Sequence, residues 1–92
     1  MPHRVVLTPA AQRQADRLRG VPLIALRGVI LGLTDDPRPS GVVKLAGGID
    51  LWRLRIGIDG QSWRVIYRID NKAKLVIITR IARRDEGTYR RI

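Results

Sequence analysis

Cysteine and phenylalanine are absent from this 92-residue sequence, and histidine occurs only once. Without cysteine the chain can form no disulfide and offers no thiolate nucleophile, which is typical of proteins from a reducing compartment. The single histidine, His3, excludes a cluster of histidine metal ligands and weakens any Ser-His-Asp interpretation. We therefore expect neither a metal site nor a small-molecule cofactor.

Long apolar runs are also missing. None reaches the roughly 18–20 residues that a membrane-spanning helix needs, and the most apolar window, residues 21–33, is interrupted by Arg27 and two glycines. Residues 1–4 lack the features of a secretory signal. These absences predict a cytoplasmic protein with no membrane partner. With 45% hydrophobic residues, residues 1–92 can form one small domain with its own core.

Positive charge is the feature present in excess. The chain has 18 Lys+Arg against 8 Asp+Glu, a net charge of +10, and 15 of the 18 basic residues are arginine. Residues 1–50 carry 7 basic and 4 acidic side chains, whereas residues 51–92 carry 11 and 4. Such a surplus predicts a polyanionic partner that contacts the second half of the chain. A GC-rich genome is an alternative source of the arginine preference, but it does not explain the net charge.

Turn-forming residues divide the chain into segments whose apolar spacing predicts an α+β fold. Thr8 and Pro9 form a strong helix start, because threonine can cap free amides and proline loses no hydrogen bond there. The expected elements are a strand over residues 4–7, an αα-hairpin over 8–20 and 21–33, and a three-stranded antiparallel meander over 51–58, 62–69 and 75–78. The helices are expected to cover one sheet face. The arginine-rich tail from residue 82 onward has no predicted element.

Alternation in two of these strands places arginines on a single face of the sheet. In the strands over 51–58 and 62–69, apolar and aromatic residues occupy every second position. The positions between them include Arg53, Arg55, Arg64 and Arg68. If the apolar residues face the helices, the four guanidinium groups share the uncovered face.

Four arginines side by side predict an anionic ligand. Adjacent like charges on a sheet destabilise it by a few tenths of a kcal/mol or more per pair unless an anion neutralises them. Guanidinium binds phosphate in a bidentate manner and can stabilise negative charge in a transition state, but it stays protonated and cannot accept a proton. The alternative is a solvated face whose long side chains cover apolar surface.

Three segments, residues 44–47 (KLAG), 51–57 (LWRLRIG) and 63–69 (WRVIYRI), carry a resemblance to a known family. Together with residues 83–85 and 88–90, they are similar to the core signature of the RelE/ParE toxin superfamily. The resemblance covers essentially the whole chain, and the pair of arginine-bearing strands is its specific part. It implies the RelE-like microbial RNase fold and a toxin of a type II toxin–antitoxin system.

The RelE branch implies a ribosome-dependent endoribonuclease, an mRNA interferase that inhibits translation. In that branch the 2′-hydroxyl of mRNA in the ribosomal A site attacks the neighbouring phosphate. The resemblance implies that Arg64 stabilises the transition state and that Tyr89 stacks on or orients the nucleotide. It places a second catalytic arginine at Arg83 or Arg84. The implied RNA contacts are Lys44, Arg53, Arg55 and Arg68.

The arginine content departs from the family pattern, since active members often have lysines where Arg53 and Arg55 stand. Proton transfer then has to come from Tyr89, Glu86, Asp85 or a ribosomal group, unless positioning and charge stabilisation suffice. For Lys44 a solvated side chain, and for Tyr89 an anchor of the tail, are structural alternatives.

The resemblance also implies two partners. They are the ribosome with mRNA in its A site and a cognate antitoxin, expected to be acidic and partly disordered. Two alternative functions stay open at this point. One is a ParE-type toxin that binds DNA gyrase without cleaving RNA, and the other is a catalytically weak RNA-binding relic.

Overall fold

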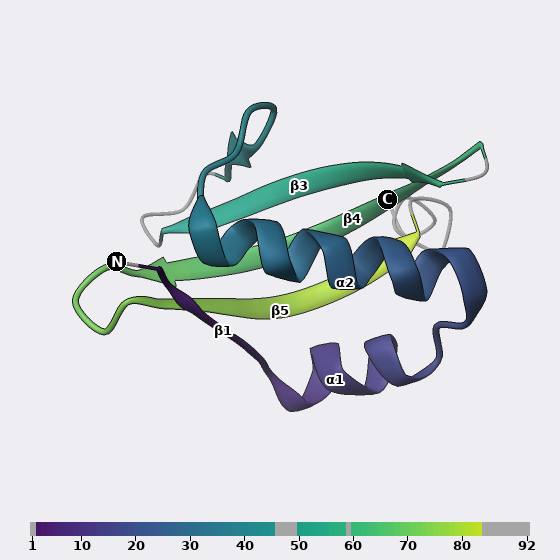
Figure 1. The fold of residues 1–92 in the computed structure, drawn as a ribbon, viewed down its shortest axis with the longest axis horizontal. Helices are drawn as coiled ribbons and strands as arrows, with labels where there is room; N and C mark the ends of the chain where they lie inside the picture. The colour runs from purple at the N-terminus through teal and green to yellow at the C-terminus, as the bar shows by residue number, and fades with distance from the viewer. Residues whose placement is uncertain (1, 46–49, 59, 84–92) are drawn as a thin grey trace.

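The computed structural model describes residues 2–45, 50–58 and 60–83, and it confirms the predicted α+β class (Figure 1). Its elements are β1 (Arg4–Leu7), α1 (Pro9–Asp16), α2 (Gly20–Asp35), β2 (Val43–Lys44), β3 (Leu51–Ile58), β4 (Gln61–Asp70) and β5 (Leu75–Arg83). Within the described residues, no helix is long and apolar enough to cross a membrane.

The strands form one five-stranded sheet in the order β1-β5-β4-β3-β2. β1 runs parallel to β5, and all other neighbours are antiparallel. The predicted meander of β3, β4 and β5 is the centre of this sheet. The prediction was incomplete at the edges, because β2 has only two residues and is too short to show an alternation. Nothing in the sequence of β1 identifies its parallel partner.

Both helices lie on one face of the sheet, as predicted (Figure 1). α2 crosses the central strands, while α1 lies beside β5 and β1. The Thr8 hydroxyl caps α1 by accepting a hydrogen bond from the backbone N–H of Ala11 at 3.2 Å. α2 begins at Gly20, whose φ of +62° lies in the left-handed region that favours glycine. The Thr8 cap and the left-handed Gly20 therefore mark where the two helices of the predicted αα-hairpin begin.

The core lies between the helices and the covered face of the sheet. Its buried members are Ala11, Leu18, Leu26, Leu33, Val65, Tyr67, Ile69, Val76, Ile78 and Ile81. The buried Tyr67 hydroxyl donates a hydrogen bond to the carbonyl oxygen of Pro37 at 2.8 Å. Burial raises the pKa of Tyr67 to about 12, so its hydroxyl stays protonated at neutral pH.

A β-bulge in β5 changes which face its later residues occupy. Tyr67 of β4 lies opposite Ile78, but the preceding residue, Ile66, lies opposite Arg80. Thr79 is therefore the extra residue, and its hydroxyl donates to the carbonyl oxygen of Ile66 at 3.2 Å. β5 continues to Arg83. The predicted strand end at residue 78, and the absence of any element from residue 82, were wrong.

Candidate nucleic-acid interface

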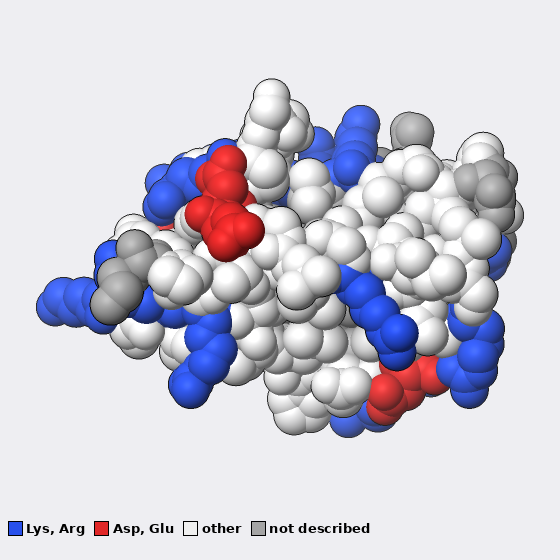
Figure 2. All heavy atoms as spheres, in the orientation of Figure 1, with Lys and Arg blue, Asp and Glu red and all other residues white. Residues whose placement is uncertain are grey.

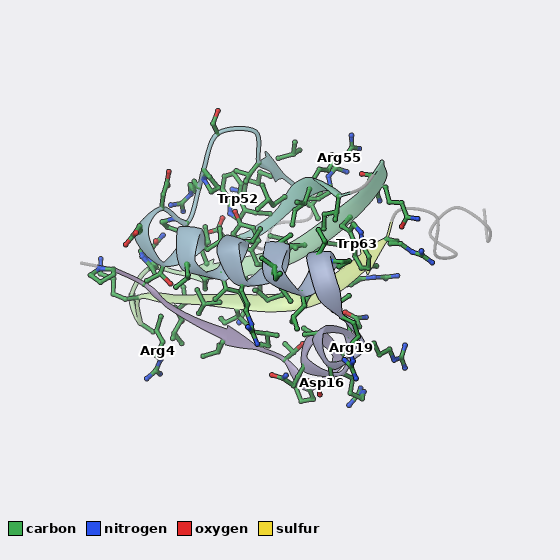
Figure 3. The ribbon with its side chains drawn as sticks, turned by 45° about the vertical axis from the view of Figure 1, so that its right-hand side comes forward. Arg4, Asp16, Arg19, Trp52, Arg55 and Trp63 are labelled. Atoms are coloured by element: carbon green, nitrogen blue, oxygen red, sulfur yellow. The ribbon has the colours of Figure 1, made fainter. Side chains whose placement is uncertain are left out.

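Five arginines project from the central strands on the sheet face that the helices leave uncovered. We call Arg53, Arg55, Arg64, Arg68 and Arg80 the arginine face. Directly opposed residues of an antiparallel ladder share a face, and Arg55 lies directly opposite Arg64. In Figure 3, Arg55 extends away from the helices, whereas Trp63 lies on the covered side. The predicted placement of the four arginines of β3 and β4 on one face is confirmed.

Arg80 joins this face through the bulge. Strict alternation from Ile78 would direct Arg80 into the core, but the extra residue Thr79 places it opposite Ile66. The sequence prediction missed Arg80 because it ended the strand at residue 78. The signal in the sequence was the polar pair Thr79-Arg80 followed by Ile81, which is only 4% exposed. Two core residues three positions apart, Ile78 and Ile81, require a shift of phase in a strand.

A small hollow separates Arg64 from Arg80. Ile66 and Ala82 complete its lining, and its volume is about 70 Å³. Ala82 lies directly opposite Arg64, so a methyl group stands where most residues would carry a longer side chain. The hollow is thus lined by two arginine side chains and two apolar ones. This arrangement suits a compact anion whose oxygens can reach both arginines.

The ion pairs of the described chain lie away from the arginine face. Both of them use Asp50, which approaches Arg38 at 3.5 Å and Lys44 at 4.0 Å. No ion pair between described residues involves Arg53, Arg55, Arg68 or Arg80. Figure 2 views the helix-covered side and shows acidic side chains there, while Asp70, two positions after Arg68 in β4, accepts a hydrogen bond from the backbone N–H of Ala73. Several guanidinium charges therefore add to one another on the uncovered face and give it a positive potential.

A buried hydrogen-bond donor of Arg53 also lacks an acceptor within the described part of the chain. Its Nε atom is buried and has no hydrogen-bond partner among the described residues. A buried donor left without a partner costs about 1–3 kcal/mol. An anion bound beside Arg53 would supply the missing acceptor and recover part of that cost.

Lys44 is not brought to the arginine face. It lies opposite Trp52 in the β2–β3 ladder, and therefore on the other side of the sheet from Arg53. Its Nζ atom stands 5.9 Å from the centroid of the Trp52 ring and 4.0 Å from Asp50. The Trp52 indole N–H in turn donates to Asp50 at 2.7 Å. This cluster gives Lys44 a structural role, and its contact with RNA stays a prediction.

Arg83 also lies apart from Arg64. It is opposite Trp63 at the end of β5, with its guanidinium 6.0 Å from that ring centroid. It donates a hydrogen bond to the Gln61 side chain at 3.1 Å. The other predicted residues of the C-terminal segment, Arg84, Asp85, Glu86 and Tyr89, lie outside the described residues. Of the two predicted catalytic residues within the described range, Arg64 lies on the arginine face and Arg83 does not.

Comparison with protein families gives one match that spans most of the chain. A model described as the ParE toxin of the type II toxin–antitoxin system, parDE, matches residues 5–87. The chain belongs to this toxin family. The RelE/ParE resemblance found in the sequence is thereby confirmed, and the protein is a toxin of a type II toxin–antitoxin system. No curated protein matches the sequence.

Solved structures show the same fold as this toxin. A chain of the RelBE2 toxin–antitoxin complex from Mycobacterium tuberculosis is 26% identical, with a TM-score of 0.76 over 91% of the toxin and 100% of that chain. A chain of the archaeal RelE–RelB complex from Pyrococcus horikoshii is also 26% identical, with a TM-score of 0.76 over 94% and 99%. The intact E. coli RelBE complex, at 15% identity and a TM-score of 0.76 over 91% and 99%, shows the fold alone.

The arginine face of the toxin can bind and stabilise negative charge but cannot move protons. All five of its charged groups are guanidinium groups, which stay protonated and offer no acceptor for a proton. Tyr67, which could in principle transfer a proton, is buried on the opposite side of β4 with its pKa raised to about 12. The described part of the site is therefore suited to phosphate recognition and to electrostatic stabilisation of a transition state.

Proposed function

We propose that this toxin is a ribosome-dependent mRNA endonuclease that inhibits translation in the cytoplasm. The observation that carries the proposal is the arginine face, which concentrates five guanidinium groups on three adjacent strands. The fold shared with RelE proteins of known toxin–antitoxin complexes supports the same function. A negatively charged strand with regularly spaced phosphates is the ligand that such a surface fits.

The proposed reaction is an internal phosphoryl transfer. The 2′-oxygen of one nucleotide forms a bond to the adjacent phosphorus, and the bond from phosphorus to the 5′-oxygen of the next nucleotide breaks. The products are a 2′,3′-cyclic phosphate and a free 5′-hydroxyl. Arg64 stabilises the additional negative charge on the phosphate in the transition state, while Arg53, Arg55 and Arg68 hold neighbouring phosphates.

The reaction also requires a proton to leave the 2′-hydroxyl and another to reach the 5′-oxygen. The arginines cannot perform either transfer. Tyr89, Glu86, Asp85 and a group of the ribosome remain the candidates, and Tyr89 is proposed to stack on or orient the nucleotide as well. The contacts of Arg83 with Gln61 and Trp63 favour Arg84 over Arg83 as the second catalytic arginine.

The proposed partners are the ribosome with mRNA in its A site and a cognate acidic antitoxin. The similar structures from M. tuberculosis and P. horikoshii are complexes of a toxin with its antitoxin. On this toxin, α2 exposes an apolar stripe of Val21, Ile24 and Leu31, which are 52%, 67% and 70% exposed. The surface over α2 is largely uncharged in Figure 2. Burial of this stripe, together with attraction to the basic domain, would hold a partly disordered acidic segment.

The test is to map mRNA 5′ ends in a purified translation system with and without the toxin. We expect cuts in phase with codons, and a loss of about 10²–10³-fold in cutting rate for Arg64→Ala, as for removal of one charge-stabilising donor. Arg27→Ala on exposed α2 removes the same charge on the covered side and should cut normally. Arg83→Ala and Arg84→Ala, made separately, identify the second arginine.

Two results would reject the proposal. Intact mRNA together with trapped gyrase–DNA cleavage complexes would establish the ParE-type activity that the matched family's name suggests. Binding of mRNA-programmed ribosomes without any cut would identify an RNA-binding relic.

A further inference from the structure

The family resemblance assigns no role to Arg80, but the β-bulge at Thr79 places it on the arginine face. It is exposed on β5 beside Arg64, and it lines the hollow that Arg64, Ile66 and Ala82 complete. We propose that Arg80 and Arg64 together bind one RNA phosphate, and that this is the phosphate at which Arg64 acts. The inference deepens the proposed function and rests on it only for the identity of the phosphate.

The first argument is geometric. Arg64 lies opposite Ala82, and Arg80 lies opposite Ile66, so the two arginines are diagonal neighbours across the β4–β5 ladder. Diagonal neighbours on one sheet face have backbones about 7–8 Å apart. Two arginine side chains at that separation can place their N–H groups on both sides of one tetrahedral phosphate. The methyl group of Ala82 leaves the intervening space open, with a volume of about 70 Å³.

The second argument concerns the bulge that delivers Arg80. A bulge interrupts the regular ladder and re-aims the side chains that follow it. Here Thr79 fills the extra position, and its hydroxyl fixes the local geometry by donating to the Ile66 carbonyl oxygen at 3.2 Å. The same shift keeps Ile81 in the core. Arg80 therefore projects from a strand with defined backbone geometry, which suits precise contact with a reacting phosphate.

The third argument is electrostatic. Two like charges on neighbouring sheet positions repel one another in the absence of a ligand. A phosphodiester between them converts this repulsion into two attractive contacts, and each guanidinium can offer two parallel N–H donors. The site accordingly gains more from an anion than either arginine would alone. No described carboxylate forms an ion pair with Arg80 that would compete with that anion.

The first experiment needs neither the ribosome nor mRNA. Inorganic phosphate is titrated into the ¹⁵N-labelled toxin while the Nε–H resonances of the arginines are followed by NMR. We expect Arg64 and Arg80 to shift with one common dissociation constant, and Arg27 to stay unchanged. In Arg80→Gln, the Arg64 shift should require at least about tenfold more phosphate, in line with the loss of charged hydrogen bonds.

The second experiment measures cutting on programmed ribosomes at saturating toxin. Arg80→Gln should lower the single-turnover rate by about tenfold or more, and Arg80→Lys should recover only part of it, because lysine lacks the bidentate fork. If both arginines contact one phosphate, the double variant Arg64→Gln/Arg80→Gln should lose at least about threefold less than the product of the single losses. Equal thermal midpoints for all variants establish that the fold is retained.

Clear results overturn the inference. If Arg80→Gln leaves both the phosphate affinity at Arg64 and the cutting rate at the wild-type values, Arg80 has no role at the site. Separate dissociation constants for Arg64 and Arg80, or fully multiplicative losses, would show that they contact different phosphates. If the wild-type toxin cuts no mRNA, the proposed function fails, but the phosphate titration still decides whether the two arginines form one anion site.

Discussion

The arginine face makes a quantitative prediction about the salt dependence of RNA binding. Each phosphate neutralised on a single strand contributes about 0.7 to the slope of log affinity against log salt. If Arg64 and Arg80 share one phosphate, the five arginines neutralise four, and the slope should be about 2.8. If each arginine binds its own phosphate, the slope should be about 3.5.

The perturbation is Arg55→Gln, which removes one exposed guanidinium and leaves the Arg64–Arg80 hollow intact. It should reduce the slope by about 0.7. For the wild-type toxin, raising salt from about 50 to about 200 mM should weaken binding by about 50- to 130-fold over the two slopes given above. Arg27→Gln is the matched control, because it changes the net charge equally but lies on α2, on the covered side of the sheet.

The assay is fluorescence anisotropy of a labelled single-stranded RNA at several salt concentrations without ribosomes. A slope below about 1 for the wild-type toxin would mean that the arginines do not contact phosphates together. If Arg27→Gln lowers the slope as much as Arg55→Gln, affinity follows net charge rather than the placement of arginines on one face. Either result would refute the reasoning from the sheet register.

Three further predictions concern the fold and the antitoxin. Tyr67→Phe should lower the free energy of unfolding by about 1 kcal/mol at neutral pH in urea titrations, through loss of the bond to Pro37. In the wild type, the unfolded chain loses the tyrosine proton near pH 10 while the folded chain keeps it until about pH 12. The free energy of unfolding should therefore fall across that window by up to about 2.7 kcal/mol. Tyr67→Phe, which lacks the hydroxyl, should not show this fall between pH 10 and pH 12. Ile24→Asp on the α2 stripe should weaken antitoxin binding by about tenfold or more in calorimetry, whereas Ala73→Asp in the exposed β4–β5 turn should not.

The sequence predicted best where one face of a strand is covered and the other is not. In β3 and β4, apolar and basic residues alternate, because only one face packs against the helices, and this places four arginines correctly. In β5 the alternation is hidden, since Leu75 and Ile77 on the uncovered face are as apolar as Val76 and Ile78 in the core. The run over residues 75–78 therefore does not show which face is covered, and the phase shift at Thr79 is indicated only by the polar pair Thr79-Arg80 before Ile81.

Edge pairing was the other feature that the sequence left undetermined. β2 consists of Val43 and Lys44, which are held by pairing with Arg53 and Trp52 rather than by a strand pattern of their own. Lys44 is thereby directed to the Trp52 side, away from the arginines. β1 pairs with β5 in parallel although two helices and three strands separate them in the chain, so this pairing depends on tertiary packing. The spacing of apolar residues within β1 or β2 predicts neither pairing.

The choice of arginine over lysine on this face bears on why the proposed reaction depends on the ribosome. Lysine can lose a proton after a pKa shift, whereas arginine cannot, so the face gains fixed phosphate contacts and gives up acid–base chemistry. A site of this kind lowers the barrier through charge stabilisation and positioning, and it still requires a proton acceptor near the 2′-hydroxyl. If that acceptor belongs to the ribosome, free RNA binds to the arginine face with the predicted salt dependence and yet is cut slowly. Binding and cutting then depend on different groups. The arginines determine where the phosphates lie, and groups of the ribosomal A site determine whether the bond breaks.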